Sequence, residues 1–186
     1  IDGIDGMAIS GAILILITLL LTLVISKNIS ELLVLFLVLF ASCLGFLFFN
    51  WPKASIFMGD SGSIFLGYCF GAFIIYSTMT NNISFFTWLV VFGYYLGDTT
   101  TTTVIRIFLV KKWYRTHRSH AYQNLARILN NHSIVTIGVV IYHLLWLLPL
   151  AIWTVLKPDF AITAVILAFL PSIAWSIKFG PLYSME

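Results

Sequence analysis

The chain has 186 residues, of which 60% are hydrophobic and only 9% are charged, with a formal net charge of +3. A soluble domain of this length could not bury so much apolar surface, so the composition predicts an integral membrane protein. The few basic residues cluster near polar loops and form no basic stripe, which excludes nucleic acid as an expected partner. Cys43 and Cys69 lie in apolar segments without disulfide or metal spacing.

Six apolar segments follow one another along the chain. A helix needs about 20 residues to cross a bilayer core of about 30 Å, and each segment approaches or exceeds that length. The runs are continuous and about twice as long as a barrel strand, so we expect an all-α, polytopic fold. Residues 1–186 are predicted to form one integral membrane domain. The predicted spans are residues 7–26, 31–50, 62–80, 84–110, 134–156 and 160–177.

Lys and Arg are distributed unequally between the two sides of the predicted membrane. Eight of the ten lie on the side of the first residues or at an adjoining helix end, and only Lys27 and Lys157 lie on the other side. Because positively charged loops stay in the cytoplasm, the first residues are predicted to face the cytoplasm. By parity, Asp2, Asp60 and His120 are then all cytoplasmic.

The first polar motif is Asp2-Gly3-Ile4-Asp5-Gly6, directly before the first span. Its two carboxylates stand three residues apart, close to one helical turn, so they can share a face. Paired acids can bind a divalent cation, or one of them can act as a base. The glycines allow a ligand to approach the backbone closely. The structural alternative is a charged, solvated helix start with ordinary capping.

The second motif, residues 57–63, reads Phe-Met-Gly-Asp-Ser-Gly-Ser and precedes the third span. Asp60 and Ser61 can cap a helix, and the positive end of that helix favours phosphate. Asp60 can instead hold Mg²⁺ that bridges phosphate oxygens. Capping alone leaves Phe57 and both glycines unexplained.

Asp98 lies inside the fourth predicted span and is followed by five threonines. A charged group at membrane depth must face protein or water, and it suggests a functional site. A polar helix break satisfied by the threonines is the structural alternative. Asp98 in an interrupted span also fits the substrate path of a transporter.

The third motif begins at His117 and continues through Arg118 and His120 to Tyr122 and Gln123. The two histidines lack a cysteine or third histidine at zinc-ligand spacing. Histidine beside arginine more naturally serves an anionic phosphate. A basic loop that merely sets the membrane topology is the alternative.

Two pairs of glycines have a structural interpretation, and two further histidines have none. Gly67 with Gly71, and Gly93 with Gly97, have the spacing of small residues at a helix interface. His132 and His143 stand alone and receive no role.

In this order, and separated by paired spans, the three motifs resemble the polyprenyl-phosphate N-acetylhexosamine-1-phosphate transferases, which include the phospho-N-acetylmuramoyl-pentapeptide transferases. The resemblance covers the whole chain, as roughly the C-terminal half of a family member. Tyr122 and Gln123 after the first histidine look like the branch that initiates O-antigen synthesis. The family's Asp-Asp pair and its asparagines would precede Ile1, so residues 1–186 alone are expected to be inactive.

The resemblance implies roles for the matching residues. Asp60 matches the aspartate that binds Mg²⁺, with Mn²⁺ as an alternative ion, and Phe57 matches the aromatic that stacks on uracil. Asp2, Arg118 and His120 match groups near the phosphates and complete the catalytic set with Asp60. Asp98 and Arg106 match a pair of less certain role. The predicted substrate-binding residues beside Phe57 are Gly3, Ile4, Asp5 and His117.

The implied enzyme is a Mg²⁺-dependent phosphotransferase. It transfers an N-acetylhexosamine 1-phosphate from its UDP-sugar to undecaprenyl phosphate, a membrane lipid, and releases UMP. The product would start O-antigen or another envelope polysaccharide, at a bacterial inner membrane with the site facing the cytoplasm. A transporter that uses Asp98 and a packing subunit of a larger complex are the competing classes, and a homodimer is left open.

Overall fold

The structure is a computed structural model that describes residues 3–28, 30–109, 114 and 119–182. It is 82% helical, and its described residues form no strand, which confirms the predicted all-α membrane fold. The elements in chain order are α1 (Met7–Ile25), α2 (Glu31–Asn50), α3 (Gly59–Met79), α4 (Phe85–Val91), α5 (Gly93–Leu109), α6 (Ala121–Leu129), α7 (His132–Tyr142), the π-helix η1 (His143–Leu147), α8 (Leu148–Leu156), the 3-10 turn η2 (Pro158–Phe160) and α9 (Ala161–Phe179).

Five of the six predicted spans form continuous segments that are long and apolar enough to cross a membrane. The predicted span 84–110 differs, because it is divided into α4 and α5. The division falls at Phe92, whose backbone leaves the helical range at φ −87° and ψ 0°. The following Gly93 lies so close to α9 that an added Cβ would stand 3.1 Å from the Ala168 Cβ. This close packing sets where α5 begins, so the fourth crossing is a broken helix.

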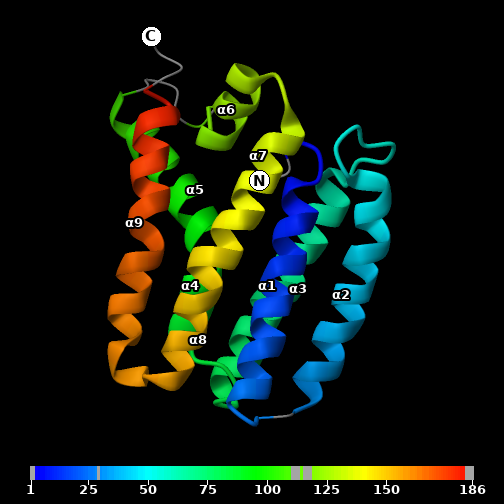
Figure 1. The fold of residues 1–186 in the computed structure, drawn as a ribbon, viewed down its shortest axis with the longest axis vertical. Coiled ribbons are helices and arrows are strands. Elements are labelled where there is room, and N and C mark those ends of the chain that lie inside the picture. Colours follow the sequence, from blue (N-terminus) through cyan, green and yellow to red (C-terminus); the bar gives the residue numbers. More distant parts are fainter. Residues whose placement is uncertain (1–2, 29, 110–113, 115–118, 183–186) are drawn as a thin grey trace.

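The connections gather at two opposite ends of the helix bundle (Figure 1). The amino-terminal residues, the connection between α2 and α3, the short helix α6 and the end of α9 lie at one end. The tight connections from α1 to α2, from α3 to α4 and from α8 to α9 lie at the other. The described parts of the three polar motifs therefore share one end, as parity predicts, and we call it the site end.

The helix α1 lies between α2 on one side and α7 and α8 on the other. In its most apolar window, 67% of α1 is buried, against 17% for α2 and 11% for α3. The outer surface carries large exposed apolar side chains, such as Phe48, Phe108 and Leu145. A soluble protein would not present so much apolar surface to water, whereas lipid chains would cover it. The protein is an integral membrane protein.

Glycines explain the close packing of α5 against α9. A Cβ added to Gly97 would clash with the Ser172 Oγ, so Gly93 and Gly97 make the predicted small-residue contact. The parallel interpretation of Gly67 and Gly71 does not agree with the structure, because an added Cβ meets no described atom within 4 Å at either position. Both glycines face away from the other described helices, on the most exposed span.

Polar side chains join helices near the end of the bundle opposite the site end. The Trp88 indole Nε1 donates to the Ser77 Oγ at 2.8 Å, and the hydroxyls of Thr87 and Thr154 lie 2.7 Å apart. All four residues are buried. In a lipid environment such bonds satisfy groups that water cannot reach, and they set the register between α3, α4 and α8.

Candidate active site

A buried carboxylate and a histidine form the centre of the site end. The Asp98 side chain comes from α5 and is only 2% exposed, and its Oδ2 lies 3.0 Å from the Nδ1 of His120. Its Oδ1 accepts from the Ser176 Oγ at 2.6 Å and from the Ala121 backbone N–H at 3.3 Å. Two donors, the Ser176 hydroxyl and the Ala121 N–H, and the His120 ring therefore converge on one carboxylate, which offsets the cost of burying it.

His120 stands immediately before α6 and begins that helix. Its carbonyl accepts from the N–H groups of Gln123 and Asn124 at 3.1 and 3.0 Å. Its own N–H donates to the Gln123 Oε1 at 3.4 Å. Its ring stacks on the ring of Tyr122, with 5.7 Å between centroids. The backbone and the ring of His120 are thus both held in place.

The short helix α6 is docked onto the end of α9. The Asn124 Nδ2 donates to the carbonyls of Phe179 and Gly180 at 2.7 and 2.9 Å, and its Oδ1 accepts from Arg127. Asn124 is buried. Because these carbonyls lie at the end of α9, they lack helical partners, and the amide satisfies them. The docking holds α6, and hence His120, against the membrane-spanning helices.

The amino-terminal motif is wedged between α6 and the α2–α3 connection. A Cβ on Gly3 would clash with the Gln123 side-chain nitrogen, and it would stand 2.8 Å from the Tyr122 hydroxyl oxygen. Gly6 adopts a positive φ of 73°, and its N–H donates to the Asn50 Oδ1 at 3.2 Å. Glycine is needed at Gly3 because a Cβ would clash there, and at Gly6 because glycine adopts the left-handed backbone without strain.

Asp5 connects three segments that are far apart in the sequence. Its Oδ2 accepts from the Ala54 N–H at 3.4 Å and lies 3.5 Å from the Nδ1 of His132. Its backbone carbonyl accepts from the Thr136 hydroxyl at 3.1 Å. The start of α1, the α2–α3 connection and the first turns of α7 therefore meet at this residue.

A polar cavity of about 290 Å³ opens beside this junction. The amino-terminal motif lines it with Gly3 and Ile4, and α6 faces it with Gln123 and Arg127. His132 closes a further side. The cavity combines a cationic side chain with backbone and amide groups, which is a combination suited to an anionic, polar ligand.

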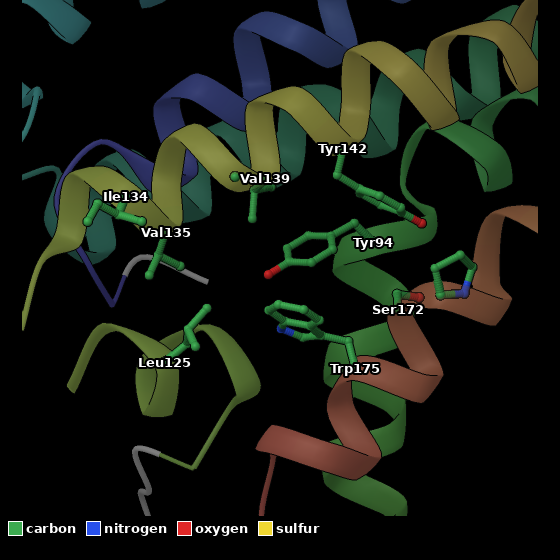
Figure 2. Close-up of a pocket in the computed structure, with 10 residues that line it drawn as sticks. Tyr94, Leu125, Ile134, Val135, Val139, Tyr142, Ser172 and Trp175 are labelled. Carbon is green, nitrogen blue, oxygen red and sulfur yellow. The ribbon is translucent and has the colours of Figure 1, made fainter. Parts of the chain in front are cut away.

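An apolar cavity of about 330 Å³ lies on the membrane side of Asp98. Its wall includes Tyr94, one helical turn before Asp98 on α5, and Ser172, one turn before Ser176 on α9. Figure 2 shows the rings of Tyr94, Tyr142 and Trp175 around this space. A polar cluster and an apolar cavity thus adjoin along the same two helices.

Asp60 and Phe57 lie at the site end but apart from this cluster. Asp60 stands in the first turn of α3, which begins three residues earlier than the sequence predicts. Met58 occupies the capping position, so Asp60 does not cap the helix, which was one of the two alternatives for this residue. The Asp60 side chain is exposed, and Phe57 is 71% exposed. Within the described ranges, no group of three or more His, Cys, Asp or Glu side chains could hold a metal ion.

Comparisons with known proteins identify the family. The model of Glycosyl transferase family 4 matches residues 1–78, which include the first two motifs. The chain belongs to this family. The predicted family resemblance is thereby confirmed, at the level of the superfamily of polyprenyl-phosphate hexosamine-1-phosphate transferases.

Three curated relatives match parts of the chain. A probable undecaprenyl-phosphate N-acetylglucosaminyl 1-phosphate transferase of Bacillus subtilis is 31% identical over 128 residues, covering 67% of this chain and 35% of that protein. A phospho-N-acetylmuramoyl-pentapeptide-transferase of Clostridioides difficile is 32% identical over 82 residues, covering 44% and 24%. That of Desulforamulus reducens is 38% identical over 71 residues, covering 38% and 21%. The matched part thus spans about a third of the first relative's length, and no solved structure matches.

The predicted site residues of this family member divide into three groups. Those brought close together are Gly3, Ile4 and Asp5, which lie against α6, α7 and the α2–α3 connection near His120. Phe57 and Asp60 share the site end but make no contact with them that the structure records. The predictions for Asp2, His117 and Arg118 fall outside the described residues.

Sequence reasoning missed four residues that organise the site. Asn50 and Thr136 hold the amino-terminal motif. His132 contacts Asp5 of that motif, and Ser176 contacts Asp98. A weak signal existed for Ser176, which stands four residues after Ser172 in an otherwise apolar span. Asn50 ends a long apolar run, where an amide is otherwise unexpected. For His132 and Thr136, the partners come from distant segments, and no local pattern reveals them.

Proposed function

We propose that the protein acts as a polyprenyl-phosphate sugar-1-phosphate transferase. One observation carries this proposal: Asp5, Asp60 and His120, from three separate motifs of a family 4 chain, lie at the same end of a membrane-spanning bundle. An enzyme that joins a lipid to a water-soluble nucleotide sugar needs its polar groups at such a membrane surface.

The proposed donor is a UDP-N-acetylhexosamine and the proposed acceptor is undecaprenyl phosphate. An oxygen of the lipid phosphate forms a bond to the β-phosphorus of the UDP-sugar. The bond between that phosphorus and the oxygen bridging to the α-phosphorus breaks, and UMP leaves with this oxygen and the electron pair. The product is undecaprenyl-diphospho-sugar.

Both reactants are anions, so the site must reduce their repulsion. His120, together with Arg118, would hold phosphate charge, and the polar cavity beside Gly3 and Arg127 offers a cationic wall to the nucleotide sugar. Phe57 is exposed and its ring is free to stack on a base. Direct attack by the lipid phosphate needs a single inversion at phosphorus, and we favour it over a covalent aspartyl intermediate.

The residues at the start of α3 fit a magnesium ion. Mg²⁺ is usually held by one or two carboxylates while waters and substrate phosphates complete its shell, so one exposed carboxylate such as Asp60 is sufficient. When bound, the ion would supply positive charge to the diphosphate. Asp60 is the proposed ligand, and Mn²⁺ is the alternative ion.

The apolar cavity next to Asp98 supports a lipid acceptor. It adjoins the polar cluster along α5 and α9, so a molecule with an anionic head and an apolar chain could contact both. A transporter is the weaker candidate, because Asp98 does not face an open path but is bonded to His120 and Ser176.

The names of the relatives and the residues Tyr122 and Gln123 bear on which sugar is transferred. The Bacillus relative is named for N-acetylglucosamine and the other two for phospho-N-acetylmuramoyl-pentapeptide. Tyr122 and Gln123 resemble the branch that initiates O-antigen, and we propose a simple UDP-N-acetylhexosamine as the donor. The bacterial relatives support a bacterial inner membrane location, and the distribution of Lys and Arg supports an orientation with the site end in the cytoplasm.

The test is an assay of the intact protein in lipid. It is incubated with undecaprenyl phosphate, Mg²⁺ and a panel of UDP-sugars, including UDP-N-acetylglucosamine and UDP-N-acetylmuramoyl-pentapeptide, and UMP is measured. Release of UMP with one or more of the UDP-N-acetylhexosamines supports the proposed function. Release with the pentapeptide donor alone would indicate that the protein catalyses lipid I synthesis instead. No UMP from any donor would refute the proposed function.

A further inference from the structure

We propose that Asp98 and Ser176 are positioning residues for His120, and that they hold its imidazole with a proton on Nδ1. The geometry of the three residues stands by itself, and only the use of His120 on a phosphate rests on the proposed function. Ser176 belongs to none of the three motifs, and the sequence indicated a functional site at Asp98 without defining what Asp98 does there.

The contacts of Asp98 indicate an ionised carboxylate. Asp98 is almost completely buried, and its two oxygens accept one backbone and two side-chain contacts. An ionised carboxylate only accepts hydrogen bonds, whereas a protonated one would point a hydrogen at one of these neighbours. The N–H of Ala121 and the Oγ–H of Ser176 both point at Oδ1. The arrangement fits the ionised form, in which every contact is a donor.

The carboxylate of Asp98 decides which nitrogen of the His120 ring carries the proton. Because an ionised carboxylate oxygen cannot donate, the Nδ1 of His120 at 3.0 Å must carry the proton. In the neutral ring, Nε2 then keeps its lone pair. Nε2 is therefore the ring nitrogen that can take up and release a proton, or donate to a phosphate once protonated. Carboxylates orient metal-bound and catalytic histidines in the same way.

The helices α6 and α9 hold the Asp98 carboxylate in place. Ala121 is the first residue of α6, so Asp98 lies at the positive end of that helix, which favours its negative charge. Ser176 is completely buried on α9, and α9 packs closely on α5 through Gly97. Asp98 is thus fixed from both sides, and its position fixes the plane of the ring.

The experiment reads the tautomer directly. The intact protein is labelled with ¹⁵N-histidine, and its ring nitrogens are recorded by NMR in lipid at a pH where the ring of His120 is neutral. His120→Gln assigns the signals by their loss. We expect Nδ1 protonated and Nε2 unprotonated. The opposite tautomer in the unmodified protein would overturn the proposal, and this measurement needs no variant to fold.

Asp98→Asn provides the reversal. Its amide oxygen can still accept from Ser176 and Ala121, but its Nδ2–H₂ now donates toward Nδ1, so we expect the proton of His120 to move to Nε2. We expect kcat to fall about 100-fold, with little change in KM for the UDP-sugar, because the proton-carrying nitrogen is lost but the binding groups remain. An unchanged tautomer in Asp98→Asn would overturn the proposal.

A matched pair on α9 separates positioning from packing. Ser176→Ala removes the donor to Asp98, and we expect kcat to fall about tenfold. Thr163→Ala, near the start of α9, removes an exposed hydroxyl that makes no recorded contact with Asp98, and we expect kcat and the tautomer to stay unchanged. Equal losses in both variants would mean that the loss does not depend on the contact with Asp98, and would overturn the role of Ser176.

The two levels of the proposal fail in different ways. If the protein releases no UMP from any UDP-sugar but His120 shows the expected tautomer and its reversal, the proposed function fails and the positioning roles stand. If UMP is released but the tautomer is the opposite one, the positioning roles fail and the proposed function stands.

Discussion

Thr18 and His143 are joined across two membrane helices, with 3.0 Å between the Thr18 Oγ1 and the His143 Nε2. Both side chains are almost completely buried between α1 and η1. The Thr18 hydroxyl donates to the Leu14 carbonyl at 2.8 Å, so it accepts from His143, whose Nε2 must carry the proton. The histidine for which the sequence indicated no role thus links the central helix to a π-helical turn, a local irregularity that places its ring toward α1.

This link makes a stability prediction. Thr18→Val keeps the shape of the side chain but leaves the His143 N–H without its partner, so we expect the free energy of unfolding in detergent micelles to fall by about 1 kcal/mol. Thr22→Val is the control, because its hydroxyl bonds to Leu19 within α1. A double-mutant cycle of Thr18→Val with His143→Leu should give a coupling energy of similar size. A coupling near zero would contradict the link.

The glycines of α5 and α3 give a matched pair for packing. A Cβ in Gly97→Ala would meet the Ser172 Cβ at 2.9 Å as well as its Oγ, so α5 and α9 must separate, and we expect a loss of about 1–3 kcal/mol in unfolding free energy. Because Asp98 is the next residue, kcat should fall too. Gly67→Ala adds a methyl in open space, and it should be neutral or stabilising by up to about 1 kcal/mol. Comparable destabilisation by both changes would speak against the packing described for α5.

Asp60 is expected to matter for activity and not for stability. Its side chain is exposed and its carboxylate takes part in none of the recorded ion pairs, so Asp60→Ala should leave the melting temperature unchanged while abolishing Mg²⁺-dependent UMP release. Asp159→Ala is the control, because Asp159 is also exposed in a first helical turn but lies at the opposite end of the bundle. Full turnover in Asp60→Ala, or turnover of the unmodified protein without a divalent ion, would exclude Asp60 as the metal ligand.

Thr136 is expected to support nucleotide-sugar binding through Asp5. Thr136→Val removes the hydroxyl that donates to the Asp5 carbonyl at 3.1 Å, so the amino-terminal motif loses one of its anchors. We expect KM for the UDP-sugar to rise by up to about tenfold, with a smaller change in kcat. Thr136→Ser keeps the hydroxyl and should restore KM. A rise in KM that Thr136→Ser does not reverse would show that the methyl group, and not the hydrogen bond, matters.

Much of the architecture could be predicted from local composition. The length of each apolar run against the bilayer thickness predicted the five continuous membrane-spanning helices, and parity placed the described parts of the three polar motifs at one end. The break after Phe92 was not predicted, because both halves of that span are apolar and the division depends on the close approach of Gly93 to Ala168 on α9. The spacing of Gly67 and Gly71 predicted a helix contact that the described residues do not make, because spacing alone does not say which surface faces another helix.

The sequence by itself determined that this is an all-α membrane protein of family 4 with the described parts of its polar motifs at one end, since hydrophobic length and the motifs can be read directly along the chain. Only the tertiary structure decided that Asp98 pairs with His120 and Ser176, and that Asp5 meets His132. Those contacts depend on how each helix is rotated about its axis and how deeply it packs. Rotation and packing follow from all neighbouring side chains together, which no single segment contains.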